Sequence, residues 1–74
     1  MCGIVGYLGN EDARELILKG LTRLEYRGYD SAGIALYNNK DNVFTIYKDR
    51  GRVDNLKQLT DFSYETHQGI GHTR

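Results

Sequence analysis

The chain opens with the stretch that decides its fold, MCGIVGYL at residues 1–8. Small residues alternate there with β-branched and aromatic ones, and Gly9-Asn10 follows as a turn, which predicts a buried strand over residues 2–8. Cys2 is the single cysteine of the chain. At the start of a strand it has two interpretations, a small buried side chain or a reactive thiol.

The reactive interpretation depends on the removal of Met1, which would leave a thiol and a free α-amine together on Cys2. An α-amine titrates near ~7.7–8.0 and a thiol near about 8.5, so the amine can accept the thiol proton at neutral pH. A terminal amine that activates a side-chain nucleophile is a known catalytic arrangement. Position and cysteine count alone leave both interpretations open.

The composition excludes several classes of protein. Seventy-four residues, 39% of them hydrophobic, form at most one small domain with little core. One cysteine cannot close an internal disulfide, and His67 and His72 make a poor zinc set, so we expect no metal site. Ten acidic and ten basic residues give zero net charge, which argues against nucleic acid or an anionic membrane as a partner.

The chain lacks the apolar runs that membranes and secretion require. No run approaches the ~18 apolar residues of a membrane span, and no basic and apolar leader precedes the first strand. A cytoplasmic, reduced protein is the simplest interpretation. The apolar pattern is still running at Arg74, so we expect further sequence beyond it.

A helix from Glu11 to Tyr26 is predicted after the first strand. Asn10 suits its N-cap, and apolar residues recur at helical spacing. These residues are Ala13, Leu16, Ile17, Leu21 and Leu24. Gly20 lies on the same stripe, where it predicts a close approach of the helix to a sheet.

Two further strands at residues 31–37 and 43–48 flank a polar turn and predict an antiparallel hairpin. Polar residues 63–68 later lead to a last strand around Ile70. Between them, a short second helix is predicted by apolar residues at intervals of three: Val53, Leu56, Leu59 and Phe62. This order of elements predicts an α+β layer structure with a mostly antiparallel sheet.

The connection LEYRGYDSAGIA, residues 24–35, has more glycine and charge than a plain connection requires. Gly28 and Gly33 permit unusual dihedral angles, and Arg27 and Asp30 could pair across a tight bend. Physical reasoning alone favours an ordered loop with a surface ion pair worth ~0–1 kcal/mol. The spacing by itself names no reaction.

Four blocks occur together in one order: CGIVG at 2–6, the block at 25–35, GRV at 51–53 and GHTR at 71–74. In this combination the chain resembles the class II glutamine amidotransferases. The first block is common to several branches of that family. EYRGYDSAG at 25–33 resembles one branch, the glutamine:fructose-6-phosphate aminotransferases, and the likeness extends over the whole chain.

The resemblance implies an N-terminal-nucleophile hydrolase fold, a four-layer αββα sandwich with antiparallel sheets. Residues 1–74 would be only the first portion of the glutaminase domain. The rest of that domain and a sugar isomerase domain would lie beyond Arg74. The full-length protein is expected to be a homo-oligomer.

The resemblance also implies a mechanism. Cys2 would attack the side-chain amide of glutamine, with its own α-amine as general acid and base, and the thioester would be hydrolysed to glutamate. The ammonia released would aminate fructose 6-phosphate. Arg74 would bind the α-carboxylate of glutamine, and Arg27 and Gly28 would support Cys2 from nearby. No cofactor is implied, and the chain alone is expected to be inactive because no oxyanion donors can be identified in it.

Alternative interpretations remain at this point. The acceptor could be that of an amidophosphoribosyltransferase or an asparagine synthetase, or the chain could be a non-catalytic binding module that retains Met1 and buries Cys2. His72 could be a general base, but the terminal amine makes that unnecessary, and one histidine without an identified orienting carboxylate is ordinary.

Overall fold

The computed structural model describes residues 3–25, 28, 30–60 and 65–74. In these ranges the elements follow the order that the sequence predicts: strand, helix, hairpin, helix, strand. They are β1 (Gly3–Leu8), α1 (Ala13–Glu25), β2 (Ala32–Asn38), β3 (Val43–Asp49), α2 (Val53–Leu59) and β4 (Gln68–Thr73). The predicted α+β class and antiparallel sheet are confirmed.

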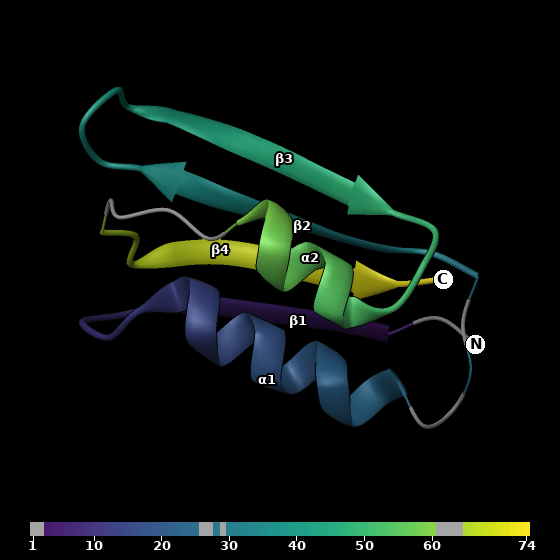
Figure 1. The fold of residues 1–74 in the computed structure, drawn as a ribbon. Coiled ribbons are helices and arrows are strands. Elements are labelled where there is room, and N and C mark those ends of the chain that lie inside the picture. The colour runs from purple at the N-terminus through teal and green to yellow at the C-terminus, as the bar shows by residue number, and fades with distance from the viewer. Residues whose placement is uncertain (1–2, 26–27, 29, 61–64) are drawn as a thin grey trace.

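The described strands form one sheet in the order β1-β4-β2-β3, and every neighbouring pair is antiparallel. The last strand, β4, therefore lies between the first two, as Figure 1 shows. Its residue Thr73 pairs with Gly3 on one side and with Ala32 on the other. The start of β1 and the end of β4 thus meet at one end of the sheet.

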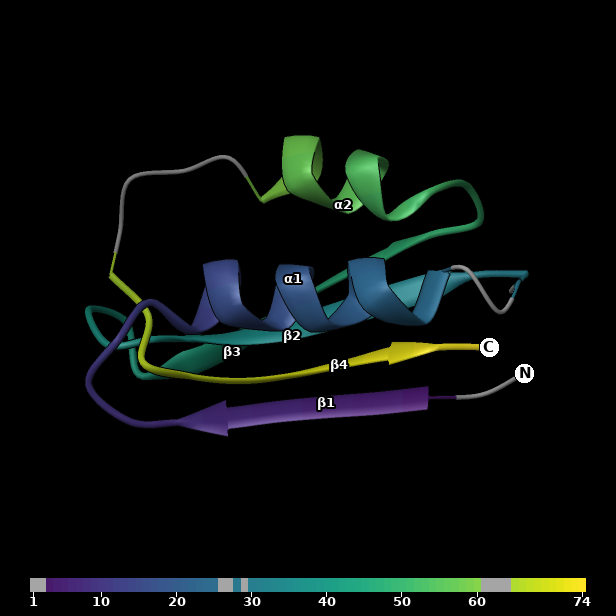
Figure 2. The same ribbon diagram turned by 90° about the horizontal axis from the view of Figure 1, so that it is seen from below.

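Both helices cover the same face of the sheet (Figure 2). α1 packs on β1 and β4, while α2 packs on β2 and β3 and also contacts α1. The core fills the space between these layers. Its buried residues are Ala13, Ile17, Leu18, Leu21, Ala32, Ile34, Leu36, Val53 and Leu56.

Gly20 allows α1 to approach β1 closely, as its position on the apolar stripe predicts. A Cβ atom at Gly20 would lie 2.9 Å from both methyl carbons of Val5. The same is true from the strand side, since a Cβ at Gly71 of β4 would lie 2.7 Å from Cγ2 of Ile17. Glycine on both elements therefore sets the distance between helix and sheet.

The first helix differs from the prediction in its cap and in its buried stripe. It begins at Ala13, and the capping residue is Asp12 rather than Asn10, because Oδ1 of Asp12 accepts a hydrogen bond from the Arg14 amide at 3.1 Å. Leu18 is buried, whereas Leu16 is only half-buried. The reason is α2, since Leu18 belongs to the same core cluster as Val53 and Leu56 of that helix, which contacts α1. The predicted end at Tyr26 lies outside the described residues.

The second helix also differs from the prediction in the residues that it buries. Val53 and Leu56 are buried, but Leu59 is 49% exposed and Thr60 is buried in its place. Positions 53, 56 and 60 follow the 3.6-residue period, whereas steps of three drift away from the buried face. The hydroxyl of Thr60 donates to the Leu56 carbonyl at 2.6 Å, which satisfies it there. Phe62 lies outside the described residues.

The second face of the sheet carries large apolar side chains that no described element covers. Strand alternation points them away from the helices. They are Ile4, Leu8, Phe44, Ile46 and Ile70, with exposures between 49% and 76%. We call this surface the open face.

Candidate functional site

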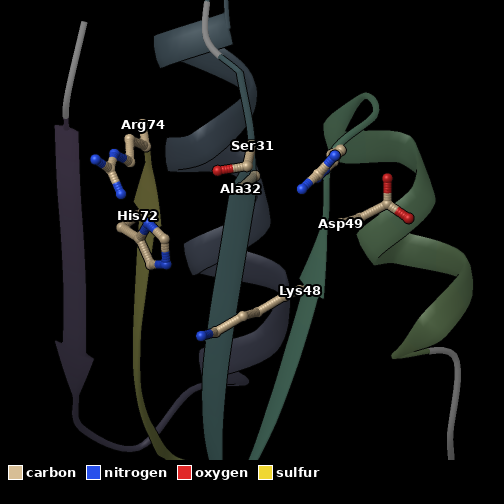
Figure 3. Close-up of a pocket in the computed structure, with 7 residues that line it drawn as sticks. Ser31, Ala32, Lys48, Asp49, His72 and Arg74 are labelled. Carbon is tan, nitrogen blue, oxygen red and sulfur yellow. The ribbon is translucent and has the colours of Figure 1, made fainter.

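Arg74 directly follows β4, and the two residues that precede β2 bond to both its amide and its carbonyl. Its amide donates to the Ser31 carbonyl at 2.8 Å, and its carbonyl accepts from the Asp30 amide at 2.5 Å. In Figure 3 the guanidinium group extends from this point on the side of β4 that adjoins β1. Asp30 and Ser31 of the glycine-rich connection therefore fix the position of the Arg74 main chain.

Arg74 lines a cavity of about 520 Å³ at this end of the sheet. The other lining residues come from β2 and the residue before it, from β3 and the turn after it, and from β4 (Figure 3). They are Ser31, Ala32, Lys48, Asp49, Arg50 and His72. Three cationic side chains thus share the cavity with one carboxylate. Such a surface suits an anionic group of a ligand, and a guanidinium can meet a carboxylate with two parallel hydrogen bonds.

The carboxylate of Asp49 is engaged in the turn that follows β3. It accepts hydrogen bonds from Nδ2 of Asn55 at 3.0 Å and from the Gly51 amide at 2.5 Å. These bonds, the one from Asn55 foremost, hold the pKa of Asp49 below its usual value. Asp49 therefore stays ionised and is occupied with the turn at neutral pH.

The imidazole of His72 extends from β4 over Gly33 of the neighbouring β2. These two residues pair in the sheet, and a Cβ atom at Gly33 would lie only 2.6 Å from Nε2 of His72. Lys48 pairs with Gly33 from the other side. The absence of a side chain at Gly33 therefore leaves room for His72 within the cavity. The alternative role of His72 as a general base stays a prediction.

Gly28 lies beside this cavity rather than in it. Its φ of +80° is a conformation that glycine adopts readily and other residues rarely adopt. A Cβ atom at this position would meet nothing within 4 Å, so the backbone conformation, rather than a lack of room for a side chain, favours glycine here. It lines a second cavity of about 350 Å³, which shares Arg50 with the first. The remaining lining residues of the second cavity are Glu25, Gly51 and Arg52.

Two predicted site residues, Cys2 and Arg27, lie outside the described residues, and so does the predicted pairing of Arg27 with Asp30. Their neighbours are nevertheless informative. Gly3, which follows Cys2, pairs directly with Thr73, which precedes Arg74. Opposed residues in an antiparallel pair have Cα atoms about 4.5–5.5 Å apart. The fold thus brings together two segments that lie at opposite ends of the sequence.

The sequence reasoning missed Ser31, Lys48 and Arg50. Their place at the cavity depends on the strand order and register, which the sequence did not predict. One signal was present in β3, where Phe44, Ile46 and Lys48 share a face and the pattern changes from apolar to charged at Lys48. That change marks the row of the sheet at which the cavity begins.

The described part of the chain contains no group of three or more His, Cys, Asp or Glu side chains that could hold a metal ion. Neither of its two helices has the length and apolar character that crossing a bilayer requires.

No family model matches the chain. Curated relatives match all of it. It is 54% identical over 74 residues to the glutamine–fructose-6-phosphate aminotransferase [isomerizing] of Bacillus subtilis (strain 168), and 54% identical over the same length to that of Bacillus cereus (strain ATCC 10987 / NRS 248). Identity to the Staphylococcus aureus (strain Mu50) protein of that name is 57% over 75 residues.

Each match covers the whole of this chain but only 12% of the length of the relative. The matched part is the N-terminal part of the relatives. The resemblance drawn from the four sequence blocks is therefore confirmed: along all 74 residues, the chain is related to the N-terminal segment of the glutamine–fructose-6-phosphate aminotransferases.

Proposed function

We propose that residues 1–74 are the first portion of a class II glutamine amidotransferase domain, with Cys2 as the nucleophile and Arg74 as the anchor for the α-carboxylate of glutamine. One observation carries this proposal. Gly3 pairs with Thr73, so the residues next to Cys2 and Arg74 are opposed at the edge of a cationic cavity. The names of the relatives, which include glutamine, support it.

The chemistry begins with removal of Met1. The α-amine of Cys2 takes the thiol proton, and Sγ attacks the side-chain amide carbon of glutamine. The carbon–nitrogen bond breaks as the amine returns the proton to the departing ammonia, which leaves a thioester. Water then adds to the thioester, and its hydrolysis gives glutamate and restores the thiol. Arg27 and Gly28 would support Cys2 during these steps.

Arg74 would select the substrate by its carboxylate. A guanidinium binds a carboxylate through two parallel charge-assisted hydrogen bonds. Hydrogen bonds to Ser31 and Asp30 hold the main chain of Arg74, so the anchor has a fixed base relative to the sheet. Lys48 and Arg50 line the same cavity and add to its attraction for an anion.

The open face supports the proposed N-terminal-nucleophile hydrolase fold. Ile4 is 74% exposed and Leu8 is 76% exposed, and such a contiguous apolar surface on a folded domain normally has a partner. In an αββα sandwich this face packs on a second antiparallel sheet at about 10 Å. Residues that follow Arg74 in a longer chain would supply that sheet.

The longer protein would be an aminotransferase. The name of the relatives couples glutamine with fructose 6-phosphate. We propose that the ammonia released at Cys2 aminates fructose 6-phosphate in a sugar isomerase domain outside this chain. The 74 residues alone would be inactive, because a tetrahedral intermediate also needs preorganised oxyanion donors and these residues offer no identified pair.

The test uses a hybrid protein in which these 74 residues replace the matching segment of the Bacillus subtilis relative. We expect mass spectrometry to find Met1 removed, a glutamine-analogue electrophile to label Cys2, and Cys2→Ser to lower glutaminase activity roughly 10³-fold or more. A folded hybrid that keeps Met1, or that hydrolyses glutamine equally well after Cys2→Ser, would refute the proposal. A hybrid that does not fold would contradict the domain assignment.

A further inference from the structure

The first turn of α2 is bonded by a side chain from another helix. Oε2 of Glu25, the last residue of α1, accepts a hydrogen bond from the Val53 amide at 3.1 Å, and Oε1 lies 3.5 Å from the guanidinium of Arg52. Arg52 occupies the N-cap position of α2 but makes no capping bond with its own side chain. Glu25 therefore satisfies an amide that α2 itself leaves without an acceptor.

The Glu25 carboxylate is mostly shielded from water. Its side chain is 18% exposed, whereas that of Arg52 is 76% exposed. A charge-assisted hydrogen bond in such a place is stronger than one at the surface. The bond to Val53 is thus the part of this contact that orders the structure, and the exposed ion pair adds little.

The bond to Val53 holds one side of the turn between β3 and α2, residues 50–52. Asp49 holds the other side through its bonds to Gly51 and Asn55. Arg50, within this turn, lines both the cavity of Arg74 and the smaller cavity beside Glu25. The position of Arg50 in the site therefore depends on the contact that Glu25 makes.

The main chain of Glu25 also begins the connection that ends on Arg74. The carbonyl of Glu25 accepts from the Gly28 amide at 3.0 Å, and the same connection later bonds to both main-chain groups of Arg74. Glu25 thus makes hydrogen bonds through two groups: its carboxylate accepts from Val53, next to the turn at 50–52, and its carbonyl accepts from Gly28.

We propose that Glu25 is a positioning residue for glutamine binding. Its carboxylate fixes the turn that carries Arg50 beside the cavity of Arg74, and Glu25 does not line that cavity itself. This inference rests on the proposed function, because it assumes that Arg74 binds the glutamine carboxylate. Loss of the carboxylate of Glu25 should raise the KM for glutamine roughly three- to tenfold while kcat changes little.

The structure offers a matched control at the opposite end of the same helix. Arg14 of α1 donates to the Lys57 carbonyl at 2.8 Å and to the Thr60 hydroxyl at 2.9 Å, so it ties down the C-terminal end of α2. Arg14→Ala and Glu25→Ala both remove a tie between α1 and α2. Only Glu25→Ala removes one next to the cavity of Arg74.

The experiment compares Glu25→Ala, Glu25→Asp and Arg14→Ala in the hybrid protein, by glutaminase kinetics and thermal unfolding. All three should lower the unfolding temperature, but only the Glu25 variants should raise the KM for glutamine. Glu25→Asp keeps the charge and withdraws it by one methylene, so it provides the comparison if Glu25→Ala does not fold. An unchanged KM in the Glu25 variants, or an equal rise in Arg14→Ala, would overturn the inference. A parent hybrid without glutaminase activity would instead count against the proposed function.

Discussion

Replacing Gly20 by alanine tests how closely α1 lies on β1. A Cβ atom there would lie 2.9 Å from Cγ1 and 2.9 Å from Cγ2 of Val5, whereas carbon atoms in ordinary contact are about 3.5–4.0 Å apart. Rotation of the Val5 side chain does not relieve the clash, because both methyl groups are equally close and a β-branched side chain in a strand is stiff. The helix or the strand must therefore move.

Two opposing terms decide the size of the effect. Overpacking of this kind costs about 1–3 kcal/mol, while alanine in place of glycine favours the helix by roughly 1 kcal/mol. We expect Gly20→Ala to lower the free energy of unfolding by about 0–2 kcal/mol. In a Val5→Ala background both methyl groups are absent, so the same substitution should stabilise the protein by up to about 1 kcal/mol.

The assay is a double-mutant cycle on the hybrid protein. Thermal and denaturant unfolding are measured for the parent, Gly20→Ala, Val5→Ala and the double variant. The decisive result is a difference between the two backgrounds, since helix propensity alone would give the same shift in both. If Gly20→Ala shifts stability by the same amount in both backgrounds, within about 0.5 kcal/mol, the close contact is refuted.

Three further predictions concern the site, the pH dependence and the open face. Arg74→Lys in the hybrid keeps the charge but loses the pair of parallel hydrogen bonds, so the KM for glutamine should rise about tenfold or more, and an unchanged KM would remove Arg74 as the anchor. The hydrogen bond from His67 to Glu65, and a second to the Glu11 carbonyl, raise the pKa of His67. The native state then binds this proton more tightly than the unfolded chain, so the stabilisation of the fold by protonated His67 is fully present below about pH 6.5 and is lost as the pH rises through the raised pKa. His67→Gln should remove that pH dependence of the free energy of unfolding, and identical pH profiles for the parent and the variant would contradict the prediction. The isolated 74 residues should unfold without a cooperative transition and bind a hydrophobic dye, because the open face has no cover, and a sharp thermal transition would disprove this.

The element order could be predicted because each element carries a local signal. The strand at 2–8 and the hairpin around residues 38–42 show period-two alternation and turn residues, and Gly20 on an apolar stripe indicates close packing on a sheet. Local signals fail where packing between elements decides. Leu18 is buried because α2 packs beside it, and Thr60 is buried in place of Leu59 because the helical period determines which positions face the core.

Local signals could not predict the strand order, because the last strand of a sheet can pair at either edge or insert between two other strands. The glycines of β4 were the available clue. Gly69 and Gly71 both face the helix side, where added Cβ atoms would lie 2.8 Å and 2.7 Å from Ile17. Glycine at these two positions suits a strand that lies directly beneath a helix. Arg74 could be predicted by resemblance, but Lys48 and Arg50 join it only through this strand order.

The open face changes its chemistry along the strands, and this change connects the fold to the site. In the middle row of the sheet, Ile70 of β4 and Ile46 of β3 lie on either side of Ala35. One row further toward the cavity, the corresponding positions are His72 and Lys48, on either side of Gly33.

Covering an ammonium group with an apolar layer is costly unless the charge is paired. A second sheet that packs on Ile70 and Ile46 can therefore extend only up to the row of Lys48. Beyond that row, water or a charged ligand must contact the sheet in its place. That boundary coincides with the rim of the cavity that Arg74 lines. The alternation that builds the strand thus also determines where the proposed sandwich ends and where a substrate could enter.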